Sequence, residues 1–89
     1  MTALEDVMAE RMRQDDKWGE QNHDPFVYLS ILMEEVGEMS KAALEARYGG
    51  HSIQEFREEA VHAAAVALAA VECIDRSKWT WGSAKDEKP

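Results

Sequence analysis

The sequence predicts an all-α protein: a bundle of three main helices and a short C-terminal turn or helix, completed by oligomerisation. Apolar residues recur at three- and four-residue intervals along most of the chain, and no alternating strand pattern is present. Helix-start signals divide the chain into three segments. A chain of 89 residues buries only a modest core by itself, so we expect self-association. We expect a single domain over residues 1–81, with a disordered tail over residues 82–89.

The first helix is predicted to run from the first residues to about Lys17. Thr2 and Glu5 have the spacing of a capping box. Apolar residues then follow at helical spacing and make this helix amphipathic, namely Leu4, Val7, Met8 and Met12. The segment 18–25 carries glycine, proline and polar turn-forming residues, which predict a loop.

The second helix is predicted from about Pro25 to Arg47. Asp24 is placed to cap it, and proline is well tolerated in the first helical turn. The pair Gly49-Gly50 should end it, because glycine readily adopts the left-handed conformation.

The third helix is predicted from a second capping box, Ser52 with Glu55, to about Arg76. Residues 60–71 are apolar except for His62, so this helix should be buried on most sides and central. Beyond it, Trp79 and Trp81 could dock a short turn on the bundle.

Composition excludes several classes of partner. With 18 acidic and 10 basic residues the formal net charge is −8, which disfavours binding to a nucleic acid polymer. A phosphorylated ligand would need a divalent cation to mediate its binding. The single cysteine, Cys73, indicates a reducing compartment and a buried apolar role. No apolar run is long enough for a membrane span and no secretion signal is evident, so we expect a cytoplasmic protein.

Two helices place acidic groups on their apolar sides. At about 100° per residue, Glu35 and Glu38 share a strip of the second helix with Ile31, Ala42 and Ala46. An unpaired buried carboxylate is costly, so it becomes neutral or acquires a cation.

The third helix also places two polar groups on its apolar side. Glu59 and His62 share a strip with Val66, Ala70 and Cys73. If the two helices pack antiparallel across Gly49-Gly50, the four polar groups lie at similar levels and form a cation site.

Structural interpretations remain open beside this one. Glutamate-rich helix faces are usually solvated, and a lone histidine on an apolar face is commonly a hydrogen-bonded core residue. Glu34, at the edge of the acidic strip, either orients or deprotonates a water at the metal or is an ordinary surface acid.

Three stretches of the chain form a distinctive set: Arg11 to Gln21, containing Lys-Trp-Gly; Glu34-Glu35-Val36-Gly37-Glu38 with Lys41; and Arg57 to His62 leading into the alanine-rich run. Together they resemble the MazG-like nucleotide pyrophosphohydrolases of the all-α NTP pyrophosphatase superfamily. The resemblance covers roughly residues 11–76.

The resemblance implies a homodimer or homotetramer that uses Mg²⁺ to hydrolyse nucleoside triphosphates, often deoxynucleotides, to the monophosphate and pyrophosphate. Glu35, Glu38 and Glu59 match its metal ligands, and Glu34 matches the acid that positions the attacking water. His62 stands where the family usually has aspartate. Because Mg²⁺ prefers oxygen ligands, we expect this imidazole to weaken Mg²⁺ binding, to favour Mn²⁺ or another transition metal, or to impair the site.

Substrate contacts follow from the same resemblance. Lys17 and Lys41 could contact phosphate, and Trp18 could stack on a base. In the alternative interpretation, Lys41 pairs with a nearby glutamate and Trp18 only covers a helix end.

Two other functions are compatible with the pattern. Glu59 and His62 have the Glu-x-x-His spacing of di-iron carboxylate bundles, which a dimer could complete. Alternatively, histidine at position 62 has disabled hydrolysis, leaving a non-catalytic module that binds nucleotides or other helices.

Overall fold

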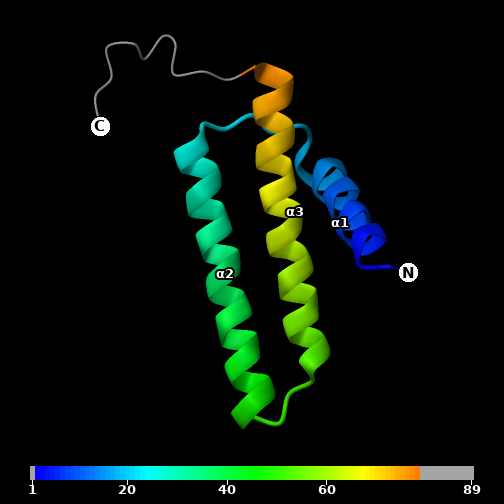
Figure 1. Cartoon of the computed structure of the whole chain (residues 1–89), viewed down its shortest axis with the longest axis vertical. Helices are drawn as coiled ribbons and strands as arrows, with labels where there is room; N and C mark the ends of the chain where they lie inside the picture. The colour runs from blue at the N-terminus through cyan, green and yellow to red at the C-terminus, as the bar shows by residue number, and fades with distance from the viewer. Residues whose placement is uncertain (1, 79–89) are drawn as a thin grey trace.

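Three α-helices account for nearly all of the described chain (Figure 1). The computed structural model of the protein describes residues 2–78. The helices are α1 (Ala3–Trp18), α2 (Pro25–Tyr48) and α3 (Ile53–Ser77), and no strand occurs in residues 2–78. The all-α prediction is confirmed, and each helix ends one residue beyond its predicted end. The expected docking of Trp79 and Trp81 and the tail at 82–89 lie outside the described residues.

The helix starts follow their sequence signals in two cases out of three. Thr2 Oγ1 accepts from the Glu5 amide at 3.1 Å, and Glu5 Oε1 accepts from the Thr2 amide at 2.8 Å, which completes the predicted capping box. Asp24 Oδ1 accepts from the amides of Phe26 and Val27. Both starts are therefore fixed by local hydrogen bonds.

The second capping box is wrong in one half. Ser52 Oγ accepts from the Gln54 amide at 3.0 Å, so Ser52 does cap α3. Glu55, however, contacts His51 Nδ1 at 2.9 Å. The Glu55 carboxylate, which was predicted to accept from the backbone of Ser52, therefore pairs with a side chain one turn away.

Helices α2 and α3 form an antiparallel hairpin, and α3 packs against both α2 and α1 (Figure 1). The turn is made possible by Gly50, whose φ of +76° lies in the left-handed region. Buried apolar residues concentrate on α3, with Ala63, Ala65, Val66 and Cys73. The prediction that the third helix is central is confirmed, but its burial on most sides is not, because Ala64, Ala67 and Val71 are exposed in the single chain.

Helix α1 turns polar side chains toward the rest of the molecule. Its buried residues are Glu10 and Arg11, whereas Leu4, Met8 and Met12 are exposed. Arg11 Nε donates to Glu72 Oε1 on α3 at 3.0 Å. Because ion pairs join α1 to α3, the apolar side of α1 remains uncovered in the single chain.

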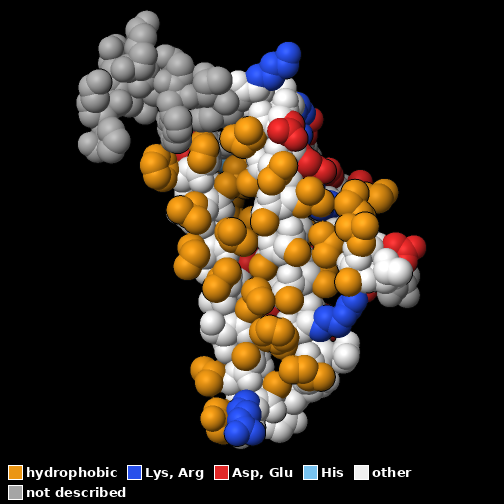
Figure 2. Space-filling model, in the orientation of Figure 1, with side chains coloured by type: hydrophobic (Ala, Val, Ile, Leu, Met, Phe, Trp, Pro, Cys, Tyr) orange, Lys and Arg blue, Asp and Glu red, His pale blue; other side chains and the backbone are white. Residues whose placement is uncertain are grey.

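A second uncovered apolar surface lies over α2 and α3. Figure 2 shows hydrophobic side chains spread over this side of the molecule. A groove of about 320 Å³ lies between the two helices, and Leu29, Leu32, Ala67 and Val71 are among its lining residues. Of the helices in residues 2–78, none combines the length and the apolarity that a membrane span requires.

Candidate metal centre

Glu35, Glu59 and His62 converge between α2 and α3. Each offers one ligand atom, and the three atoms lie within 4.8 Å of one another. All three side chains are half-buried. Because α2 and α3 run antiparallel, Glu35 on α2 comes close to the turn of α3 that carries the other two residues. Within the part of the chain that the structure describes, this is the one group of acidic, histidine or cysteine side chains close enough to share an ion.

The His62 ring lies between two carboxylates. Its Nδ1 is 3.7 Å from Glu59 Oε2, one turn earlier on α3, and its Nε2 is 3.9 Å from Glu10 Oε1 on α1. All three helices therefore contribute to the surroundings of the centre.

Burial raises the pKa of the Glu35 carboxyl above its ordinary value. His62 acts in the opposite direction, and the neighbouring carboxylates of Glu59, Glu38 and Glu10 raise the pKa further. Glu35 is thus a carboxylate whose charge is poorly compensated by the protein alone. A bound cation would remove this penalty.

Glu10 is the site residue that the sequence did not reveal. Its side chain is only 10% exposed, and hydrogen bonds from Arg13 lower its pKa despite the opposing effect of burial. Gln14 Nε2 also donates to it at 3.1 Å. The apolar pattern of α1 pointed to Leu4, Met8 and Met12, and no spacing motif marked Glu10 as an inward residue.

Two predicted acids lie at the margin of the centre. Glu38 is exposed and outside the close group, although its charge reaches Glu35. Glu34 is exposed as well. The structure therefore brings three of the four predicted ligands together and leaves Glu38 one helical turn away along α2.

A cavity of about 180 Å³ adjoins the centre. Glu35 and His62 line it together with Trp18, Ile31 and Val66. The predicted aromatic residue and two predicted ligands thus share one cavity. Its walls combine apolar, amide and charged side chains.

The two predicted phosphate-binding lysines are exposed. Lys17 Nζ lies 4.8 Å from the ring centroid of its neighbour Trp18. Lys41 lies on α2 beyond Glu38 and is not among the residues that line the cavity.

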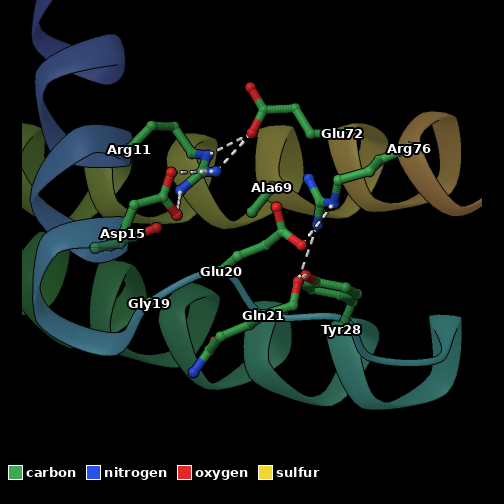
Figure 3. A pocket seen from close by; sticks show the side chains of 10 residues that line it. Arg11, Asp15, Gly19, Glu20, Gln21, Tyr28, Ala69, Glu72 and Arg76 are labelled. Atoms are coloured by element: carbon green, nitrogen blue, oxygen red, sulfur yellow. Dashed lines mark hydrogen bonds and ion pairs between the residues drawn. The ribbon is translucent and has the colours of Figure 1, made fainter.

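A second polar hollow, of about 110 Å³, is occupied by its own ion pairs (Figure 3). Arg11 bonds with Glu72 and Asp15, and Arg76 donates to the Gln21 carbonyl at 3.1 Å. The guanidinium groups of Arg11 and Arg76 already have partners within the protein. Their bonds hold α1 and the 19–24 loop against α3, so this hollow does not resemble a ligand site.

Comparison of the chain with protein-family models, with curated proteins and with solved structures gives no match. The residues of this centre and the sequence motifs are therefore the features that indicate a function.

Proposed function

We propose that the protein is a metal-dependent nucleoside triphosphate pyrophosphohydrolase that cleaves the α–β phosphate linkage of nucleotides or deoxynucleotides to give the monophosphate and pyrophosphate. The observation that carries the proposal is the convergence of Glu35, Glu59 and His62 within 4.8 Å, beside a cavity that Trp18 also lines. The resemblance of the surrounding motifs to MazG-like enzymes supplies the reaction.

The donor set fits a divalent cation. Two carboxylates supply hard oxygen ligands suited to Mg²⁺, and an imidazole is better matched to Mn²⁺ or another transition metal. We therefore propose that the centre accepts Mg²⁺ and binds Mn²⁺ more tightly. A bound cation there would neutralise charge on the phosphates and lower the pKa of a water molecule.

The remaining residues have roles compatible with this chemistry. Glu35, Glu59 and His62 hold the ion, and Glu38 joins them through a change of rotamer or through water. Glu34 orients or deprotonates the attacking water, and being exposed it is open to solvent.

The substrate would lie along the cavity. Trp18 stacks on the base, and Lys17, already beside the Trp18 ring, reaches a phosphate together with Lys41. With a net charge of −8, the chain repels a nucleotide unless cations are present.

We propose that a homodimer or homotetramer in the cytoplasm is the working form. Few apolar residues of the single chain are fully buried, while Leu29, Met33, Val36 and Leu44 on α2 are each at least 38% exposed. Such a surface is typical of an interface between copies. A second copy would cover this side of α2 and the neighbouring groove.

The test is pyrophosphate release from a panel of ribo- and deoxynucleoside triphosphates with Mg²⁺ or Mn²⁺. We expect turnover of at least one nucleotide, and its loss in Glu35→Gln and Glu59→Gln. Glu58→Gln is the matched control, because Glu58 adjoins Glu59 but is exposed and outside the group. Nucleotide binding without turnover would favour the non-catalytic module, and the absence of both would reject the proposal.

A further inference from the structure

The two nitrogens of the His62 ring face carboxylates from different helices. Nδ1 is 3.7 Å from Oε2 of Glu59, which belongs to the close group with Glu35. Nε2 is 3.9 Å from Glu10 Oε1 on α1. The ring thus has one side toward the proposed ion and the other toward Glu10.

Glu10 is held in a fixed orientation. Arg13 donates through Nε to Oε1 at 2.8 Å and through Nη2 to Oε2 at 2.6 Å, and Gln14 donates to Oε2 at 3.1 Å. A carboxylate oxygen has two acceptor positions, so Oε1 retains one for a further donor. His62 Nε2, at 3.9 Å from Oε1, is a candidate that a small movement of the ring would bring within hydrogen-bond distance.

The charges near the two ring nitrogens of His62 differ. The Arg13 guanidinium pairs with Glu10 and places a positive charge on the Nε2 side, where it would repel a divalent ion. On the Nδ1 side, Glu59, a member of the close group with Glu35, provides negative charge. An ion is therefore favoured at Nδ1 and a hydrogen atom at Nε2.

We propose that Glu10 is a positioning residue of the metal centre, which accepts the Nε2–H of His62 and so directs Nδ1 toward an ion shared with Glu35 and Glu59. This inference rests on the metal site of the proposed function. In metal proteins a ligating histidine commonly donates its second nitrogen to a carboxylate, which fixes the tautomer and the ring orientation. Helix α1 would thus tune the centre without supplying a ligand.

The experiment uses Zn²⁺ as a diamagnetic probe with the full chain. Isothermal titration calorimetry gives the affinity, and long-range ¹H–¹⁵N NMR identifies which nitrogen of His62 carries hydrogen when Zn²⁺ is bound. We expect the Nε2–H tautomer in the parent protein and a loss of affinity of about 10- to 100-fold in Glu10→Ala. Glu10→Gln should lose less, because its amide oxygen can still accept from Nε2.

Glu72→Ala is the matched control. It removes another α3–α1 ion pair, with Arg11, but Glu72 lines the other hollow and lies outside the metal group. Its Zn²⁺ affinity should equal that of the parent. Circular dichroism of each variant establishes that the helices are retained.

The outcomes separate the two proposals. If the parent protein binds no Zn²⁺, the metal centre and this inference both fail. If the parent binds Zn²⁺ but Glu10→Ala and Glu10→Gln match it in affinity, or if Nδ1 carries the hydrogen, the role of Glu10 is rejected and the metal centre stands.

Discussion

His62 and Glu59 lie one helical turn apart on α3, with Nδ1 3.7 Å from Oε2, and both come within reach of Glu35 on the antiparallel helix α2. An imidazole and two carboxylates thus form one donor set. Such a set would prefer transition metals over Mg²⁺ more strongly than a purely acidic set does, because nitrogen ligands suit transition metals better than Mg²⁺.

The first prediction concerns this preference. His62→Asp replaces the nitrogen ligand with oxygen, so we expect the ratio of Mn²⁺ to Mg²⁺ affinity to fall by about tenfold, the lower end of the effects seen when a metal-site partner is altered. Calorimetric titration with each ion measures the ratio. His23→Asp serves as a control because His23 lies outside the metal group. An unchanged ratio in His62→Asp would show that His62 does not contact the ion.

The second prediction concerns pH and the metal-free protein. The pKa of Glu35 is raised in the folded state, so its ionisation opposes folding. The contribution of Glu35 to stability is therefore most favourable at pH values below the ordinary glutamate pKa. It is lost as the pH rises through the higher pKa that Glu35 has in the folded state. Glu35→Gln should therefore be more stable than the parent at neutral pH, with the difference vanishing near pH 4. Urea unfolding at a series of pH values measures it.

Ionisation of Glu10 should have the opposite effect on the free energy of unfolding. Its pKa is lowered in the folded state by Arg13, so its contribution is present above the ordinary pKa and is lost as pH falls through the folded value. Glu10→Gln should therefore be less stable than the parent at neutral pH. The stability difference from the parent should thus depend on pH with opposite sign in Glu35→Gln and Glu10→Gln. The same pH dependence in both variants would contradict this description of the two carboxyl groups.

The third prediction concerns the attachment of α1. Arg11 is buried and bonds with both Glu72 and Asp15, so Arg11→Ala should lower the free energy of unfolding by about 1.5–3 kcal/mol. Arg57→Ala removes the more exposed pair with Asp6 and should cost at most about 1 kcal/mol. Chemical denaturation measures both values. Equal losses would mean that burial of Arg11 does not strengthen its ion pairs.

The fourth prediction concerns self-association. Met33 is 56% exposed and belongs to the apolar strip of α2 proposed as the interface, Leu29, Met33, Val36 and Leu44, so Met33→Glu should shift the protein toward the monomer. Gln54→Glu adds the same charge at an exposed position on α3 outside that strip. Light scattering coupled to size-exclusion chromatography gives the molar mass. A parent protein that is already monomeric would reject the proposed assembly.

Local signals predicted most of the fold. The Thr2 and Asp24 caps, the glycine turn and the long apolar run of α3 each depend on neighbouring residues, which a sequence displays directly. The assignment of Glu55 to a cap failed because His51, one turn earlier, competes for the same carboxylate.

The metal centre was only partly predictable. Helical periodicity placed Glu35, Glu59 and His62 on inward strips, and the antiparallel hairpin then brought them together. Periodicity gave Glu38 the same direction, but its side chain is exposed, although Ala42, one turn further along the same strip, is buried. The inward position of Glu10 was not predicted, because α1 packs through ion pairs and the spacing of hydrophobic residues does not reveal these.

The most direct test of the account is a Mn²⁺ titration of the parent protein, followed by electron paramagnetic resonance, beside Glu59→Gln and Glu58→Gln. We predict one tightly bound Mn²⁺ per chain in the parent and in Glu58→Gln, and its loss in Glu59→Gln. Absence of tight binding in the parent, or equal binding in all three proteins, would contradict the claim that Glu35, Glu59 and His62 share an ion.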